Sequence, residues 1–259
     1  MRVLVTRPAE QARELIDLLA ARGLAGVSVP AVVIRHEPAG SPFDAALDGL
    51  TGAAWLVITS ANGAIALAAR LRAMRRGMPN GTRLAAVGPA TAAALRGAGF
   101  TVHHVPDDYL TVAIADGLDK LRGRRVVLAR ADVATPDLAD ALRALGAIVE
   151  EVVAYRTLEG PPTEAPALEA ALHDGLDAIS LTSGSTARGL AQLSAALPVQ
   201  EARSLQRLPV FVIGPVTARA AQRAGFAPTA IATVHTAEAL ADTIAATLTA
   251  ATLTPQEAR

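Results

Sequence analysis

The chain has 259 residues, 51% of them hydrophobic and 19% charged, which is enough apolar material for one large or two ordinary globular domains. Its 24 basic and 24 acidic residues balance, so no whole-molecule field attracts nucleic acid or an anionic membrane, and an anionic ligand must be held locally. The absence of cysteine excludes disulfides, thiolate catalysis and sulfur-ligated metals, and is typical of a reducing cytoplasm.

Short apolar runs alternate with helical patterns from the start of the chain. The opening residues predict a strand and an amphipathic helix rather than an export signal. In the first half, strands are predicted at 2–7, 56–60, 84–88 and 101–105, and helices at 9–22, 62–76, 89–98 and 111–121. The second half repeats the pattern with strands at 125–130, 177–183, 210–214 and 227–232. Such alternation predicts an α/β fold with parallel sheets built from right-handed crossovers.

The two halves are related in sequence. VGPATAAALRGAGF at 87–100 aligns with IGPVTARAAQRAGF at 213–226, and eight of the fourteen residues are identical. A shift of 123 residues places Arg7 on Arg130 and relates two Pro/Gly-rich segments, RHEPAGSP and LEGPPTEA. These two segments are predicted to be linkers.

Two domain arrangements fit the paired linkers. Either each half of the chain forms its own domain, or the middle of the chain is a domain inserted into another, which is then discontinuous. Equivalent double linkers favour insertion, and two crossings between doubly wound lobes predict a hinge and a cleft. The predicted boundaries are 1–36 plus 164–259 for the first lobe, 42–155 for the inserted lobe, and 35–42 and 156–166 for the linkers.

Ligands of open parallel sheets bind beyond the carboxyl ends of the strands. Four turns follow predicted strands there, and their small residues expose backbone amides that attract anions. Each turn alone is better explained as an ordinary helix cap, but four together favour a binding site. The turns are Ser60-Ala61-Asn62-Gly63, Gly88-Pro89-Ala90-Thr91, Ser183-Gly184-Ser185-Thr186 and Gly214-Pro215-Val216-Thr217.

Three further side chains are candidates for the same site. Arg7 and Arg130 end equivalent strands and either bring cationic donors there or form surface salt bridges. Tyr155, in VVAYRT, is either functional or an aromatic lid on a sheet edge.

No dinucleotide fingerprint, P-loop or GxSxG elbow is present. The five histidines show no spacing that suggests ligands beyond the pair His103-His104, so no metal is expected.

The order and spacing of VTRP, ITSANG, VGPAT, IGPVT, VVAYRT and HTAEALADTI resemble the uroporphyrinogen-III synthase family over nearly the whole chain. The resemblance implies two flavodoxin-like doubly wound parallel-sheet lobes, one discontinuous, joined by a two-stranded linker. It also implies a cytoplasmic lyase that needs no cofactor. The implied reaction cyclises hydroxymethylbilane, a linear tetrapyrrole with eight carboxylates, to uroporphyrinogen III with loss of water and inversion of ring D.

Site residues and partners follow from the same resemblance. It implies Tyr155 as the proton donor, and Val216 departs from it because relatives often carry a second hydroxyl residue there. The resemblance also implies that hydroxymethylbilane synthase hands the substrate over to this enzyme. The enzyme is expected to be a monomer that binds neither nucleic acid nor membrane. The expected substrate-binding residues are Arg7, Ser60, Ala61, Asn62, Thr91, Arg130, Ser183, Ser185 and Thr217.

Two other classes of protein remain open at this point. A two-lobed protein that closes on a small polyanion without chemistry would share the architecture, but it normally carries an export signal. A carboxylate-binding regulatory module would need a nucleic-acid-binding element or a basic stripe to transmit its signal, and the sequence shows neither.

Overall fold

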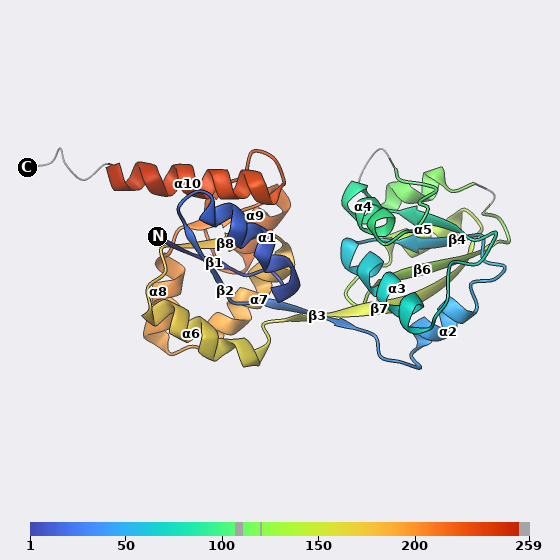
Figure 1. Ribbon diagram of the computed structural model, residues 1–259, viewed down its shortest axis with the longest axis horizontal. Helices are drawn as coiled ribbons and strands as arrows, with labels where there is room; N and C mark the ends of the chain where they lie inside the picture. The colour runs from blue at the N-terminus through green and yellow to red at the C-terminus, as the bar shows by residue number, and fades with distance from the viewer. Residues whose placement is uncertain (107–110, 120, 254–259) are drawn as a thin grey trace, which may run out of the picture. The chain divides into compact units, whose positions relative to one another are not determined.

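The structure is a computed structural model that describes residues 1–106, 111–119 and 121–253. The chain folds into two compact units (Figure 1). Unit 1 contains Met1–Val33 with Leu158–Arg259, and unit 2 contains Ile34–Thr157. No helix in the described ranges is both long and apolar enough to cross a membrane.

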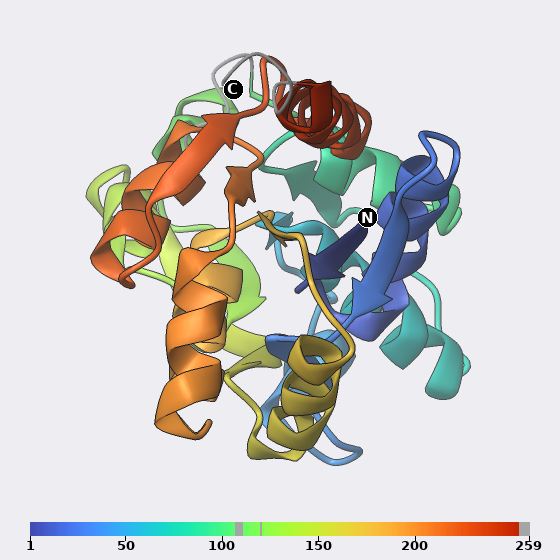
Figure 2. The same cartoon turned by 90° about the vertical axis from the view of Figure 1, so that its left-hand side faces the viewer.

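Unit 1 is built on a five-stranded sheet in the order β10-β9-β8-β1-β2, and all of its strand pairs are parallel. Helices cover both faces of this sheet (Figure 2). The central strands are apolar at almost every position because both of their faces are buried. The strands are β1 Arg2–Val5, β2 Ala25–Ser28, β8 Ala178–Leu181, β9 Val210–Val212 and β10 Pro228–Ile231.

The side chains of these strands alternate between two cores. Val3 and Phe211 pack with α1 (Ala9–Ala20) and α10 (Ala237–Leu253). Leu4 and Val212 point to the opposite face and its helices. Those helices are α6 Ala165–His173, α7 Gly184–Ala195, α8 Val199–Arg207 and α9 Pro215–Arg223, with the short 3₁₀ helix η2 Pro162–Glu164 before α6.

Unit 2 repeats the three-layer arrangement around a sheet in the order β3-β7-β6-β4-β5. The pairs β7–β6, β6–β4 and β4–β5 are parallel. The strands are β3 Val32–His36, β4 Trp55–Ile58, β5 Arg83–Ala86, β6 Arg125–Ala131 and β7 Ile148–Glu159. One face carries α2 Pro42–Asp48, α3 Ala61–Ala73 and α4 Pro89–Gly97, and the other carries η1 Thr111–Gly117 and α5 Asp137–Ala144. The predicted α/β class with parallel sheets is confirmed.

The sequence duplication is visible in the strand order. Four strands in the order β9-β8-β1-β2 correspond to β5-β4-β6-β7, and β10 in unit 1 corresponds to residues 102–105 in unit 2. The strand predicted at 101–105 is wrong, because only an isolated bridge between Ala85 and His104 forms there. In unit 1 the N–H of Ala232 donates to the carbonyl of Val212 over 2.9 Å. The equivalent residue of unit 2 is Pro106, which has no N–H to donate.

The helix predicted over 111–121 is also shorter and of a different type. Residues Thr111–Gly117 form the 3₁₀ helix η1, and residue 120 lies outside the described residues. The imidazole of His104 packs directly on Gly117, where a Cβ atom would lie 2.0 Å from the ring. Any residue with a side chain at this position would displace the histidine.

The chain passes between the units within two strands. β3 continues to His36 and β7 continues to Glu159, so part of each segment predicted as a linker is regular strand. β7 stops where Gly160 adopts a positive φ of 58° and Pro161 follows without an N–H.

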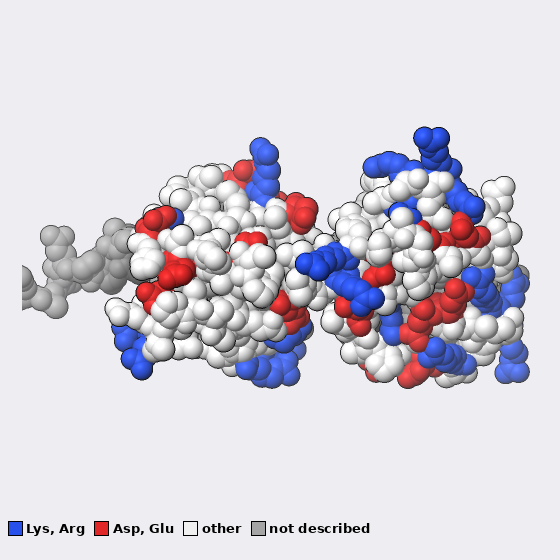
Figure 3. Space-filling model, turned by 90° about the horizontal axis from the view of Figure 1, so that it is seen from below, with Lys and Arg blue, Asp and Glu red and all other residues white. Residues whose placement is uncertain are grey.

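Acidic and basic side chains are mixed on both units. On the face drawn in Figure 3, basic and acidic groups lie next to one another rather than in separate stripes. Many of them are paired within their own unit, as Arg22 is with Asp242 at 2.7 Å. This surface does not resemble the basic stripe of a nucleic-acid-binding face.

Candidate active site

The four predicted turns lie at the carboxyl edges of the two sheets. Ser60 follows β4 and is the N-cap of α3, and Gly88 follows β5 and is the N-cap of α4. In unit 1, Ser183 and Gly214 hold the same places before α7 and α9. Each cap has extended backbone angles, so the first amides of each helix point out along its axis and favour an anion.

Tyr155 and Ser60 are hydrogen-bonded to each other in unit 2. Their hydroxyl oxygens lie 2.8 Å apart, and either group can donate. Ser60 Oγ also accepts the N–H of Gly63 over 3.0 Å, which caps α3. The serine therefore joins the helix start to the tyrosine of β7 in one network.

An irregularity in β7 directs Tyr155 toward this network. Arg130 is paired with Val153 and Ala131 with Tyr155, so one extra residue, Ala154, is accommodated in β7. Both Ala154 and Tyr155 are consequently buried, although successive residues of a regular strand face opposite sides. Bulges of this kind often change the aim of a side chain next to a functional site.

The environment of Tyr155 keeps its hydroxyl protonated. Burial raises the pKa of the Tyr155 phenol, the hydrogen bond with Ser60 opposes this rise, and the nearby Asp132 carboxylate adds to it. The side chain is only 6% exposed. A neutral hydroxyl that can donate a proton is therefore the stable form over the whole physiological range.

Gly63 leaves room for this arrangement. A Cβ atom there would lie 3.2 Å from the Ile58 side chain, 3.3 Å from Ser60 Oγ and 3.8 Å from the Tyr155 ring. Ala61 and Asn62 are the first two residues of α3, between Ser60 and this glycine. The small residues of the turn thus allow the helix start to approach the tyrosine closely.

Thr91 and Thr217 occupy equivalent positions in α4 and α9. They are 4% and 5% exposed, and neither hydroxyl forms a hydrogen bond with any other residue that the structure describes. Each follows a glycine N-cap, which offers no side chain for a reciprocal cap. The helix-cap interpretation therefore does not account for these two hydroxyls.

Ser183 and Ser185 differ from the threonines because they are engaged in a cap. Ser183 Oγ accepts the N–H of Thr186 over 3.1 Å, and Thr186 Oγ1 donates to the Ser183 carbonyl over 2.8 Å. The hydroxyl oxygens of Ser183 and Ser185 lie 2.9 Å apart. This capping box stabilises the start of α7 and fixes the rotamers of both serines.

The two predicted arginines are already paired with carboxylates of their own units. Arg7 donates to Glu14 over 3.1 Å, and because Glu14 is 67% exposed this pair is weak and exchangeable. Arg130 binds Glu151 and donates to the Thr135 carbonyl over 2.5 Å. A ligand carboxylate at either arginine would have to compete with these partners.

A family comparison shows which family the chain belongs to. A family model described as Uroporphyrinogen-III synthase HemD matches residues 13–242. The chain belongs to the uroporphyrinogen-III synthase family. It is accordingly a cyclising lyase of tetrapyrrole biosynthesis.

Individual relatives agree with the uroporphyrinogen-III synthase assignment. The uroporphyrinogen-III synthase of Synechococcus elongatus is 29% identical over 221 residues, which are 83% of each chain. A putative uroporphyrinogen-III synthase of Methanothermobacter thermautotrophicus is 29% identical over 85% of this chain and 88% of its own length.

Solved structures show the same fold. A mutant uroporphyrinogen III synthase from Thermus thermophilus has a TM-score of 0.67 at 20% identity, over 96% of this chain and 99% of that one. The Helicobacter pylori enzyme has a TM-score of 0.61 at 19% identity, over 95% of this chain and 98% of that one. The predicted family and fold class are both confirmed.

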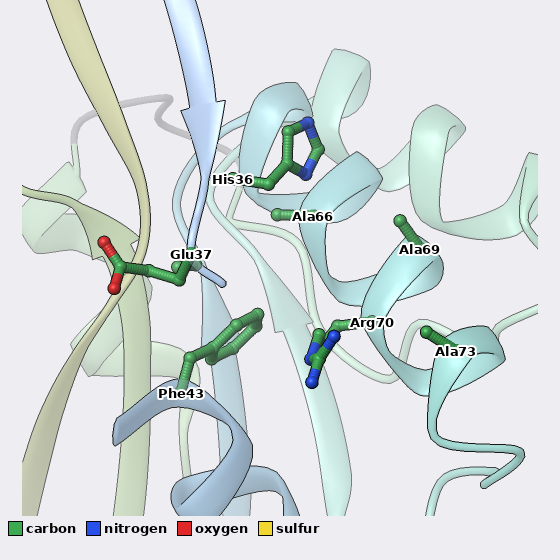
Figure 4. Close-up of a pocket in the computed structure, with 8 residues that line it drawn as sticks. His36, Glu37, Phe43, Ala66, Ala69, Arg70 and Ala73 are labelled. Atoms are coloured by element: carbon green, nitrogen blue, oxygen red, sulfur yellow. The ribbon is translucent and has the colours of Figure 1, made fainter. Parts of the chain in front are cut away.

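This synthase also contains a hollow that the sequence does not reveal. It has a volume of about 240 Å³ in unit 2 and is lined by none of the predicted site residues. Figure 4 shows Phe43 and Arg70 directed toward it, with three alanines of α3 along one wall. Arg70 is held by Asp44, and this hydrogen-bonded pairing lowers the pKa of the Asp44 carboxyl. The lining is His36, Glu37, Phe43, Ala66, Ala69, Arg70, Ala73 and Ala154.

Proposed function

We propose that the chain binds hydroxymethylbilane and closes it to uroporphyrinogen III, with the hydroxyl pair of Tyr155 and Ser60 supplying the proton that the departing hydroxyl group needs. The observation that carries this proposal is the 2.8 Å hydrogen bond between the two hydroxyls at the carboxyl edge of the unit 2 sheet. Open parallel sheets bind their ligands at this edge.

The reaction needs a proton donor that carries no charge. Loss of hydroxide from the ring A hydroxymethyl group leaves an azafulvenium cation, and ring D attacks it through its already substituted position to give a spiro intermediate. Fragmentation and reclosure then invert ring D. At neutral pH an Asp or Glu side chain is a carboxylate, which has no proton to donate and is repelled by the eight carboxylates of the substrate, whereas a tyrosine hydroxyl keeps its proton.

The raised pKa of Tyr155 is compatible with this role. Its phenol is a weaker acid than free tyrosine because it is buried. Departing hydroxide is nonetheless a far stronger base than a phenolate, because the pKa of water is well above that of a phenol. Ser60 is less buried than Tyr155 and is hydrogen-bonded to it, so the serine hydroxyl offers a route by which the proton reaches the substrate.

The helix starts supply uncharged donors for the carboxylates. In unit 2 these are the turns of α3 and α4 with Thr91, and in unit 1 those of α7 and α9 with Thr217. Backbone amides at helix N-termini bind anions without formal charge, which suits a chain of zero net charge. Arg7 and Arg130 add cationic donors once they release Glu14 and Glu151.

Holding the substrate in one conformation is the larger part of the catalytic task. Unassisted closure gives the isomer without inversion, so the enzyme must keep ring D off its easier trajectory. A substrate that waits in solution closes to the wrong isomer, so we propose that hydroxymethylbilane synthase delivers it directly. We also propose that the enzyme is a monomer.

The test is product analysis. The purified chain, far below the substrate concentration, is incubated with enzymatically generated hydroxymethylbilane, and the type I and type III products are separated. The proposal predicts many equivalents of type III per chain, against type I without protein. A non-catalytic binding protein would at most protect one equivalent of substrate, and type I product at every protein concentration would refute the proposed activity.

A further inference from the structure

Three side chains of metal-ligating types meet on unit 1, between α6 and α8, which lie side by side (Figure 1). Glu169 and His173 come from α6 and Glu201 from α8, and one ligand atom of each lies within 4.8 Å of the other two. We propose that these residues form a site for a divalent metal ion of the Zn²⁺ type, which joins the two helices.

The fold holds these residues in place. Glu169 and His173 are four residues apart on α6, so they share one face of the helix. Leu168 on α6 and Leu205 on α8 are fully buried in the same core, which fixes the two helices against each other. Glu201 stands in the first turn of α8, where it faces the pair on α6.

One carboxylate of the cluster has an oxygen without a partner among the described residues. Glu201 Oε2 is completely buried, and no residue that the structure describes donates a hydrogen bond to it. The other oxygen, Oε1, lies 3.9 Å from His173 Nε2, which is too far for a hydrogen bond. Among the described residues no arginine or lysine pairs with Glu169 or Glu201, so two adjacent carboxylates have no fixed cation between them.

The donor set selects the metal. One imidazole nitrogen and two carboxylate oxygens, with a water molecule in the fourth position, match the preference of Zn²⁺, which takes such ligands at about 2.0–2.2 Å in tetrahedral geometry. Neighbouring ligands of that tetrahedron are roughly 3.3 Å apart, so a small rotation of the exposed His173 brings its nitrogen from 3.9 Å into place. A metal ion bound by Glu201 would place a positive charge next to its buried oxygen Oε2, which has no partner among the described residues.

The position of the cluster indicates a structural role. His173 is the last residue of α6 and is followed by the start of β8, so the cluster lies at the amino edge of the sheet, whereas Ser183 marks the carboxyl edge of the same strand. The metal would therefore stabilise the contact between α6 and α8 without taking part in the proposed chemistry, and the inference does not depend on the proposed function.

The test uses the full chain without an affinity tag, treated with a chelator and dialysed, and titrated with ZnCl₂ by calorimetry. We expect one Zn²⁺ per chain and a higher unfolding temperature with the metal, as for any ligand that binds only the folded state. His173→Ala and Glu201→Gln should each weaken Zn²⁺ binding at least tenfold and remove the thermal shift. His235→Ala replaces another exposed histidine of unit 1 and should behave as wild type.

Two results would overturn the inference. One is a wild-type chain that binds Zn²⁺ no more tightly than His173→Ala, which would mean that the cluster is only a group of solvated side chains. The other is equal loss of Zn²⁺ binding in His235→Ala, which would place the metal elsewhere. Circular dichroism of each variant without metal checks that the fold is retained, and Glu201→Gln serves as the near-isosteric second variant.

Discussion

The hydroxyl oxygens of Ser60 and Tyr155 lie 2.8 Å apart although 95 residues separate them in the chain. Ser60 also caps α3 through the N–H of Gly63. One serine side chain therefore stabilises the helix start at the carboxyl edge of the sheet and holds the group that we propose as the proton donor. Removal of either hydroxyl leaves the other without this partner, so the two positions should behave as a coupled pair.

The buried Tyr155 predicts a specific loss of stability at alkaline pH. Because burial raises its pKa in the folded state, the folded protein holds the phenol proton more tightly than the unfolded chain, whose tyrosine titrates near pH 10. This contribution is fully present below about pH 10 and is lost as the pH rises through the folded pKa. Urea unfolding at pH 9 and pH 11 should show a larger loss for wild type than for Tyr155→Phe. An identical loss in both proteins would contradict the assignment.

The hydroxyls of Thr91 and Thr217, which form no hydrogen bond with another described residue, should contribute to binding rather than to folding. Thr217→Val keeps the shape of the side chain and removes only the hydroxyl, so the unfolding temperature should not fall. Product affinity should weaken by about 1–2 kcal/mol, the value of one hydrogen bond. Thr91→Val should behave in the same way. Thr186→Val is the matched control, because its hydroxyl completes a capping box and its loss should cost about 1 kcal/mol of stability.

Product binding measured by calorimetry, beside thermal unfolding, separates the two roles. Unchanged product affinity in both Thr91→Val and Thr217→Val would remove these threonines from the site. A fall in stability equal to that of Thr186→Val would mean instead that their hydroxyls serve the fold.

Gly189 permits a close approach between α7 and the neighbouring backbone of unit 1. A Cβ atom there would lie 2.0 Å from the Ala31 carbonyl oxygen and 3.0 Å from the Gly160 nitrogen. Gly189→Ala should therefore destabilise the protein by about 1–3 kcal/mol or more, because backbone must move. Gly97→Ala, a helical glycine with no atom within 4 Å of the new Cβ, should be neutral or stabilising. Equal unfolding midpoints for the two variants would show that α7 shifts freely.

Much of the fold could be predicted because its determinants are local. Buried parallel strands read as short apolar runs, and the duplicated GPxT turns mark where two of them end. The strand predicted at 101–105 does not form, because Pro106 lacks the N–H that its counterpart in unit 1 donates to the neighbouring strand. The pattern of apolar residues alone does not show this missing donor. The sequence does not predict that β7 extends through Tyr155 to Glu159, because the Pro and Gly residues that follow are typical of a linker.

The contacts between side chains could not be predicted, because they depend on which strands become neighbours. The 2.8 Å contact between Tyr155 and Ser60 needs both the strand order of the sheet and the extra residue in β7. The sequence does not reveal the cluster around His173, because Glu201 comes from another helix, 28 residues further along the chain. The pairing of Arg7 with Glu14 agrees with the salt-bridge alternative that the sequence left open.

The most direct test of the central claim is the initial rate of uroporphyrinogen III formation by Tyr155→Phe. This variant keeps the buried ring and removes only the hydroxyl that binds Ser60. If the hydroxyl pair donates the proton, the rate should fall by roughly 10²-fold or more, while product affinity and the unfolding temperature below pH 9 stay close to wild type. A variant that forms the type III product at the full wild-type rate would contradict the account.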